Sequence, residues 1–182
     1  GYVYAAQTTA VQLEGNLDTN PTGPMTTTFD VYDTLGTTHT VTVTFTKTGA
    51  GTWGWSAASP DGAIASTGTV TFGADGHTST APGAISLALT TPNGATSPID
   101  FVIDFSRISQ LSGETNLQAT SQDGLPMGTL KDFIIDVNGV INGSFTNGMN
   151  RVLGQIALAR FANPSGLYNE GSNLWGISPN SG

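Results

Sequence analysis

Alternation of threonine with large apolar residues is the feature that most restricts the fold of this chain. It is clearest in the segment THTVTVTFTK, where every second residue is Val41, Val43 or Phe45. Side chains two apart along a strand share one face, so a period of two predicts a half-buried strand. The turn-forming run Asp33-Thr34-Leu35-Gly36 precedes this segment. We therefore expect a β-hairpin over residues 26–47, with Gly36 able to adopt a positive φ.

Shorter runs of the same kind recur between turns rich in Gly, Pro and Asn. Their apolar members are Val11 and Leu13; Trp53 and Trp55; Val70 and Phe72; Ile85, Leu87 and Leu89; and Ile99, Phe101, Ile103 and Phe105. Many short strands at close spacing predict an all-β sandwich or small barrel. The 24 glycines and abundant threonines also disfavour long helices.

The second half of the chain differs from the first. Ser106–Gly124 is polar and breaks the rhythm, which indicates a crossing between two domains with room for one helical turn. Alternation returns at 132–137, and Asn138-Gly139 and Asn147-Gly148 predict two-residue turns. The segment 151–161 fits either a helix face or a strand. A later Gly/Asn/Pro-rich run holds apolar residues that need a surface to cover: Phe161, Leu167, Tyr168, Leu174 and Trp175.

The composition excludes several partners and kinds of site. Charged residues make up only 10% and the net charge is −8. The basic residues are scattered, which argues against nucleic acid, and the acidic balance argues against anionic membranes. They are Lys47, Arg107, Lys131, Arg151 and Arg160. The absence of cysteine removes disulfides, thiolate metal sites and cysteine nucleophiles. No apolar run approaches the ~20 residues of a membrane helix, and no secretory signal opens the chain.

Two acidic pairs, Asp100/Asp104 and Asp132/Asp136, are candidates for acid–base chemistry. Residues four apart in a strand lie about 13 Å from each other at ~3.3 Å per residue. Glycosidase carboxylates are separated by only ~5–9.5 Å. We therefore expect these aspartates on solvent faces, opposite packed Phe and Ile residues.

The histidines and tryptophans are the remaining candidates. His39 and His77 show no metal-ligand spacing, and no nucleophile elbow accompanies them, so we expect His39 in a hairpin rather than in catalysis. Asp30 with Asp33, and Asp136 with Asn138, are too sparse for a calcium loop. Trp53 and Trp55 could stack on a sugar, but core or subunit packing is the simpler interpretation. The sequence predicts no catalytic residue, metal ligand or cofactor, and no enzyme.

Several segments resemble the bacterial flagellar hook protein family and its axial relatives, the rod proteins. FDVYDTLGTTHTVTVTFTK is similar to the hairpin of the hook family, and AVQLEGNLDTN to the strand before it. The later pattern G-x-L-x-x-F-x-I-D, then G-x-F-x-N-G, LGQIALARFANPSGL and EGSNLW is similar to the family's consensus. The likeness covers about Ala6 to Gly182 and is weakest at 50–98. Rod proteins generally lack the intervening barrel, so residues 10–112 favour the hook.

This resemblance implies a discontinuous architecture. Residues 10–112 would be an outer β-barrel domain inserted into a middle β domain formed by 1–9 and 113–182. Residues 154–161 would then be strand. The terminal helices of the family and the upstream part of the middle domain have no counterpart here, so we expect the chain to be part of a longer protein.

The resemblance also implies a function. The chain would be a structural subunit of the flagellar hook, a curved flexible tube that transmits motor torque to the filament. It would polymerise with itself and meet rod, hook-cap and hook–filament junction proteins outside the cell, after export by the flagellar secretion apparatus. This chain alone would be monomeric, and its sequence identifies no residues of a subunit contact. The alternatives are an extracellular β-sandwich module that binds carbohydrate or a host surface, resting on Trp53 and Trp55, and, third, an enzyme resting on His39 and the acids.

Overall fold

The computed structural model describes residues 2–157, and every regular element in that range is a β-strand. The strands are β1 (Val3–Ala6), β2 (Ala10–Leu17), β3 (Met25–Tyr32), β4 (Thr38–Gly49), β5 (Thr52–Ala58), β6 (Gly62–Ile64), β7 (Thr67–Thr71), β8 (Gly83–Leu89), β9 (Ile99–Gln110), β10 (Asn116–Gln122), β11 (Leu125–Ile135), β12 (Val140–Phe145) and β13 (Asn150–Gln155). Within residues 2–157 no helix is long and apolar enough to cross a membrane. The predicted all-β fold class is confirmed.

The chain divides into two compact units. The larger comprises Tyr4–Met127, and the smaller comprises Gly1–Val3 with Gly128–Gly182. Residues 4–9 and 113–127, which the sequence assigned to the other domain, fall in the larger unit. The reason is that β10 pairs with β2 along Asn116–Gln122 and so extends the sheet of the larger unit.

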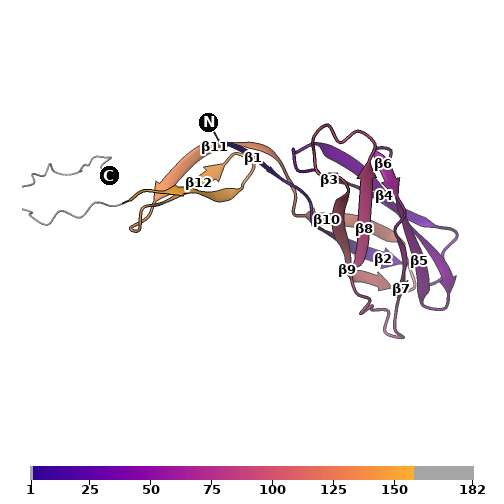
Figure 1. Cartoon of the computed structure of the whole chain (residues 1–182). Coiled ribbons are helices and arrows are strands. Elements are labelled where there is room, and N and C mark those ends of the chain that lie inside the picture. The colour runs from indigo at the N-terminus through magenta and orange to yellow at the C-terminus, as the bar shows by residue number, and fades with distance from the viewer. Residues whose placement is uncertain (1, 158–182) are drawn as a thin grey trace, which may run out of the picture. The chain divides into compact units, whose positions relative to one another are not determined.

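The larger unit consists of two sheets (Figure 1). One has the order β10-β2-β9-β8-β6 and the other β3-β4-β5-β7. Neighbouring strands are antiparallel except β2 and β9, which run parallel. The edge strands of the first sheet reach the second, since β10 packs against β3 and β6 against β5. The sheets therefore enclose one continuous core.

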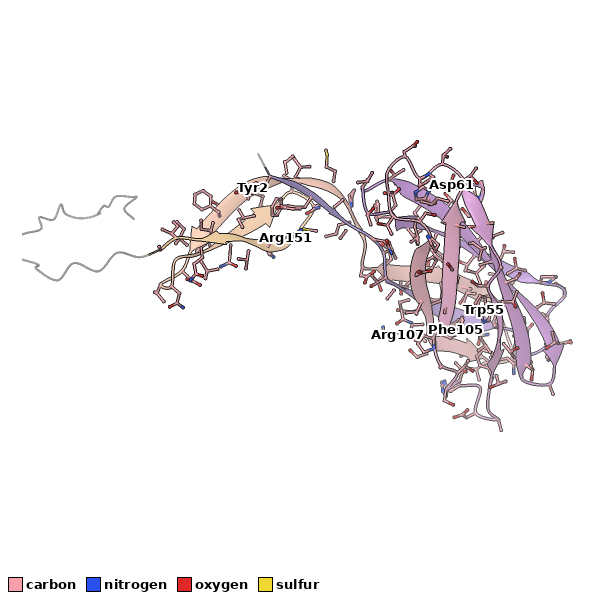
Figure 2. The ribbon with its side chains drawn as sticks, in the orientation of Figure 1. Tyr2, Trp55, Asp61, Phe105, Arg107 and Arg151 are labelled. Atoms are coloured by element: carbon pink, nitrogen blue, oxygen red, sulfur yellow. The ribbon has the colours of Figure 1, made fainter. Side chains whose placement is uncertain are left out.

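Alternation explains how each strand joins this core. In β4, Val41, Val43 and Phe45 are fully buried, while the threonines between them face outward. Aromatic rings then link the two sheets. Phe105 of β9 lies 6.1 Å from Phe45 and 5.9 Å from Trp55 between ring centroids. Figure 2 shows Trp55 and Phe105 together inside the larger unit. Rings at these separations contribute beyond the apolar area that they bury.

The polar segment Ser106–Gly124 is not a crossing with a helical turn. Its first five residues complete β9, and Asn116–Gln122 forms β10. Ile108 and Leu117 are buried from this segment. The segment is polar because β10 is the edge strand of its sheet and exposes one face to solvent.

Four loops share one geometry, in which a glycine takes the fourth position. In the β3–β4 loop, Asp33 N–H donates to Thr37 O at 3.0 Å, and Gly36 N–H donates to Asp33 O at 3.1 Å. Gly36 has the expected positive φ, 85°. The same bonds close the loops at 73–77, 136–140 and 145–149. Asn138-Gly139 and Asn147-Gly148 are therefore not two-residue turns, because only the glycine has a positive φ.

The smaller unit is built on the antiparallel strands β11, β12 and β13. Phe145 is its one large buried apolar side chain among the described residues, at 1% exposure. The ambiguous segment after residue 150 is strand as far as Gln155. Residues 158–161, with Phe161, Leu167, Tyr168, Leu174 and Trp175, lie outside the described residues.

Candidate functional site

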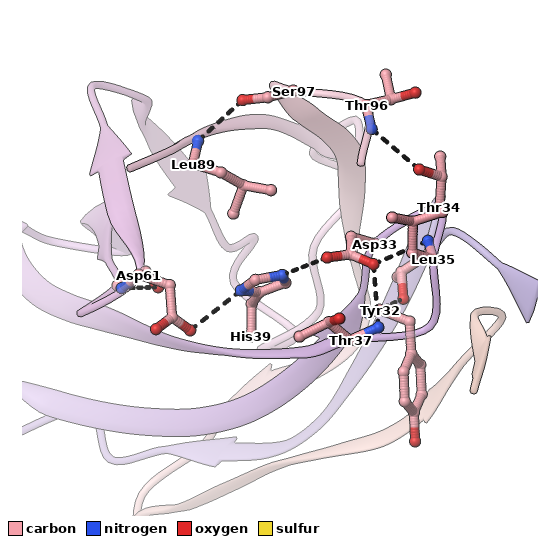
Figure 3. A network of polar contacts seen from close by, with 12 residues as sticks. Tyr32, Asp33, Thr34, Leu35, Thr37, His39, Asp61, Leu89, Thr96 and Ser97 are labelled. Atoms are coloured by element: carbon pink, nitrogen blue, oxygen red, sulfur yellow. Dashed lines mark hydrogen bonds and ion pairs between the residues drawn. The ribbon is translucent and has the colours of Figure 1, made fainter. Parts of the chain in front are cut away.

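His39 lies between two aspartates, Asp33 and Asp61, in a polar cluster (Figure 3). Its Nε2 is 2.8 Å from Asp33 Oδ2, and its Nδ1 is 3.2 Å from Asp61 Oδ2. The side chains of His39 and Asp33 are 8% and 3% exposed, and that of Asp61 is 39% exposed. We call these three residues the His39 cluster.

Asp33 also organises the β3–β4 loop. Its Oδ1 accepts the backbone N–H groups of Leu35 at 2.9 Å and Thr37 at 3.0 Å. Burial raises the pKa of the Asp33 carboxyl, but the hydrogen bonds from His39, Thr37 and Leu35 outweigh burial and hold that pKa below its ordinary value. The carboxylate is therefore kept charged by donors that also fix the loop.

The His39 cluster ties three loops together (Figure 3). Asp61 lies between β5 and β6, and its backbone O accepts Thr90 N–H at 3.0 Å from the loop after β8. In that loop, Thr96 N–H donates to Thr34 Oγ1 at 2.9 Å. A histidine used in this way is a structural link, since no described nucleophile completes a triad with it.

A second polar network joins the segment before β2 to the end of β10. Thr8 is fully buried, and its hydroxyl donates to Gln122 Oε1 at 2.6 Å while it accepts Tyr32 N–H at 2.9 Å. Asp123 Oδ1 accepts Thr9 N–H at 2.7 Å and Ala10 N–H at 3.0 Å. Burial raises the pKa of the Asp123 carboxyl, but the hydrogen bonds from Thr9 and Ala10 outweigh burial and hold that pKa below its ordinary value.

The other candidate acids and bases do not come together. The aspartates at 100 and 104 share the outer face of β9, opposite buried Phe101 and Ile103, as predicted. The expectation is wrong for the second pair: Asp132 is exposed in β11, but Phe133 and Ile135 beside it are exposed rather than packed. Asp136 follows the strand, and its Oδ1 accepts the backbone N–H groups of Asn138 and Val140. These acids are parts of strands and turns.

His77 is exposed, and in the described part of the chain no side-chain hydrogen bond of its ring is found. It lines a surface hollow of about 450 Å³ beside Asp75. Asp75 Oδ1 accepts the backbone N–H of His77 at 3.1 Å. Within residues 2–157 no group of three or more His, Asp or Glu side chains could hold a metal ion.

Trp53 and Trp55 are core residues, as the simpler interpretation held. They are 0% and 5% exposed. The indole N–H of Trp53 donates to Gln110 Oε1 at 2.7 Å, and both side chains are buried. A sugar-stacking platform needs exposed rings, so the carbohydrate-binding alternative loses the feature on which it rested.

Sequence reasoning missed several members of these networks. No sequence motif marks four of them: Asp61, Gln110, Thr8 and Gln122. Asp61 begins an Asp-Gly turn, but nothing local indicates that it reaches a histidine 22 residues away.

The smaller unit presents exposed apolar side chains on β11 and beyond. Phe133 is 54% exposed, Ile134 68%, and Ile135 45%. Val137 and Val152 are exposed as well. Phe133 and Ile135 point to one face of β11 and Ile134 to the other, so large apolar side chains are exposed on both faces of this strand.

Comparison with known proteins shows which family the chain resembles. The family described as the flagellar basal body protein FlaE D2 domain matches residues 5–125. The flagellar hook protein FlgE of Escherichia coli K12 is 31% identical over 98% of this chain and 48% of its own length. The hook protein of Salmonella typhimurium LT2 is 30% identical over 98% of this chain and 49% of its own length. The chain thus spans about half the length of these relatives.

A solved structure, Helicobacter pylori flagellar hook protein FlgE2, aligns over 87% of this chain and 37% of its own, with a TM-score of 0.46 and 23% identity. The match to residues 5–125 covers most of the larger unit, from within β1 to the first residue of β11. The chain belongs to the flagellar basal body protein FlaE D2 domain family, and its curated relatives are flagellar hook proteins.

Proposed function

We propose that this chain is part of a structural subunit of the bacterial flagellar hook, which polymerises into a curved, flexible tube that transmits motor torque to the filament. The family match over residues 5–125 carries the proposal, because hook proteins are the relatives that align along nearly the whole chain. The role is structural rather than enzymatic.

The buried, hydrogen-bonded polar side chains of the larger unit support a rigid module. The buried titratable group His39 is held between Asp33 and Asp61, and the buried indole N–H of Trp53 is held by Gln110. Buried polar groups with partners stiffen a core and specify one arrangement. A subunit that transmits torque needs this rigidity within each unit.

The threonine-rich outer face of the β3–β4 hairpin suits subunit contacts that break and form again. Thr26 lies opposite Thr44, and Thr28 lies opposite Thr42, whose hydroxyls are 2.9 Å apart. When a curved tube rotates about its own axis, each subunit contact must change once per turn. Polar contacts of modest area suit this demand better than the large apolar interfaces of permanent complexes. Uncharged hydroxyls exchange readily between protein and water partners.

The domain arrangement is part of the same proposal. An outer domain of about residues 10–112 would be inserted into a middle domain made of 1–9 and 113–182. The exposed apolar side chains of β11 support it, since Phe133, Ile134 and Ile135 would be covered by the remainder of the middle domain in the whole protein. Limited proteolysis of the whole protein tests the boundaries. First cuts near residues 9 and 112 support this division, whereas first cuts near 3 and 127 favour the two compact units.

The proposed partners are further copies of the same protein and, at the ends of the tube, rod, hook-cap and hook–filament junction proteins. The proposed place is outside the cell, reached through the flagellar secretion apparatus. Without the rest of the subunit, the 182-residue chain would be monomeric in solution, which sedimentation velocity would test.

Tagging the whole protein tests its place in the flagellum. The loop between β9 and β10 contains exposed Gly113, where an added Cβ would meet no atom within 4 Å, so an epitope can be inserted there. The tagged gene should restore swimming to a strain that lacks the gene, and immunogold label should decorate short curved tubes at the base of the filament. The untagged gene is the control for background label. Label along the filament, or normal hooks in the strain without the gene, would refute the proposal.

A further inference from the structure

The sequence holds Asn-Gly four times, at Asn93, Asn138, Asn142 and Asn147. In this dipeptide the glycine has no side chain to keep its backbone nitrogen away from the amide carbon of the preceding asparagine. Whether the two atoms meet depends on how tightly the fold holds that peptide. The four sites differ sharply in this respect.

Three of the sites are held by hydrogen bonds or strand pairing. Gly139 N–H donates to Asp136 O, and Gly148 N–H donates to Phe145 O, each at 3.0 Å. Gly143 lies inside β12, opposite Phe133 on one side and Arg151 on the other. At these sites, the nitrogen cannot turn toward the asparagine side chain without breaking a loop or a ladder.

Asn93 and Gly94 lie in the loop between β8 and β9, and both are exposed. Among the described residues, neither the Gly94 N–H nor the Asn93 side chain has a hydrogen-bond partner. Asn93 has φ 50°, a left-handed conformation that a non-glycine residue adopts at a cost. Around Gly94, an added Cβ would meet only Leu35 Cδ1, at 3.7 Å. A hydrogen bond from Ala95 N–H to Pro92 O spans this turn, but the Gly94 N–H inside it has no hydrogen-bond partner among the described residues, unlike the N–H groups of Gly139 and Gly148.

We propose that Asn93 is the site at which the folded protein modifies itself by deamidation. The Gly94 nitrogen attacks the side-chain carbonyl carbon of Asn93, a carbon–nitrogen bond forms, and the amide nitrogen leaves as ammonia after taking up the proton. Water then opens the cyclic imide at either carbonyl, giving aspartate or isoaspartate at position 93. No oxidant or cofactor takes part.

The flanking contacts give this modification a structural consequence. Ala95 N–H donates to Pro92 O, and Thr96 N–H donates to Thr34 Oγ1 in the loop beside the His39 cluster, each at 2.9 Å. Each event adds a negative charge to an acidic protein. The isoaspartate product also lengthens the backbone between Pro92 and Thr96, so it loosens the link between the β8–β9 and β3–β4 loops.

Peptide mass spectrometry of the 182-residue chain tests the proposal. The folded protein is incubated in mildly alkaline buffer, and deamidation is followed at all four sites, with a parallel sample in concentrated urea. In urea the four sites should react at similar rates. In the folded protein, position 93 should react severalfold faster than positions 138, 142 and 147, and close to its own rate in urea.

Two variants sharpen the test. Gly94→Ala should slow the reaction at position 93 and leave the other three sites unchanged, because the added Cβ hinders the attacking nitrogen. Gly148→Ala, also at a positive φ of 90° with no atom within 4 Å of an added Cβ, should leave position 93 unchanged. If folding slows deamidation at position 93 as strongly as it slows deamidation at positions 138 and 147, the proposal is overturned.

Discussion

His39 Nε2 lies 2.8 Å from Asp33 Oδ2, and both side chains are buried. The other ring nitrogen faces Asp61 Oδ2 at 3.2 Å. Each ring nitrogen of His39 therefore faces a carboxylate oxygen from a different loop. The histidine thus links the β3–β4 loop to the loop before β6, because each ring nitrogen contacts a carboxylate of one of these loops.

Removing the imidazole should destabilise the larger unit. His39→Ala leaves the buried Asp33 carboxylate without its side-chain donor, and we expect a loss of about 2–3 kcal/mol in the free energy of unfolding. His39→Gln, whose amide can donate to Asp33, should retain part of it. Urea denaturation measures both. The matched control is His77→Ala, at an exposed site, which should stay within about 0.5 kcal/mol of wild type. An equal effect of the two alanine substitutions would contradict this role.

The lowered pKa of Asp33 predicts how stability depends on pH. Because the folded pKa lies below that of the unfolded chain, the carboxylate contributes stability above the ordinary carboxyl pKa of about 3.9 and loses it as pH falls through the folded value. Asp33→Asn should therefore be about 1–2 kcal/mol less stable near neutral pH, with the difference shrinking in acid. Exposed Asp30→Asn is the control. A difference that stays constant down to acid pH would show that the charge of Asp33 is not the cause.

Local patterns predicted the strands well because burial of every second residue is a local property. In β9, Ile99, Phe101, Ile103 and Phe105 are buried as the alternation indicated. The segment Ser106–Gly124 was misinterpreted for a physical reason. An edge strand such as β10 buries few large side chains, here Leu117, and so resembles a linker in sequence. The prediction of a two-residue turn after Asp136 was also wrong. The side-chain Oδ1 of Asp136 accepts two backbone N–H groups and so stabilises a longer loop.

The polar networks could not be predicted from the sequence. His39 was identified as a hairpin residue, but its partner Asp61 is 22 positions away and belongs to another loop. Gln110 is 57 positions from Trp53. No periodic signal marks a polar residue whose partner arrives through sheet packing, so such pairs become visible only once the strands are placed.

The Trp53–Gln110 pair should show energetic coupling. Gln110→Met leaves the buried indole N–H without an acceptor, and we expect a loss of about 1–3 kcal/mol. Trp53→Phe removes the donor instead. In the double variant neither polar group remains unpaired, so its loss should be smaller than the sum of the single losses by about 1 kcal/mol. Strictly additive losses in urea denaturation would show that the hydrogen bond contributes nothing.

Thr8 offers a substitution that preserves shape. Thr8→Val keeps the volume but removes the hydroxyl that donates to Gln122 Oε1 and accepts Tyr32 N–H. Both partners lose a bond at a fully buried position, so we expect a loss of about 1–3 kcal/mol. Thr28→Val, on the exposed face of β3, should change stability by no more than about 0.5 kcal/mol. Similar melting temperatures for the two variants would refute a structural role for the Thr8 hydroxyl.

Gly36 should be more sensitive to substitution than its backbone conformation alone requires. Its φ of 85° makes a side chain cost about 1–2 kcal/mol. An added Cβ would also lie 2.8 Å from Met127 N and 3.3 Å from Pro126 C, so backbone must shift as well. Gly94 in the same unit has φ 93°, but its added Cβ would meet only a flexible leucine methyl at 3.7 Å.

Comparing Gly36→Ala with Gly94→Ala therefore separates the two costs. Gly94→Ala should lose only the conformational cost, about 1–2 kcal/mol, whereas Gly36→Ala should lose more because the Pro126–Met127 backbone is displaced. Gly36→Val should be worse again, since its branched side chain adds bulk at the same contact. Thermal and urea unfolding of the three variants measure the order. Equal losses for the two alanine variants would show that the loop yields to the side chain without disturbing residues 126 and 127.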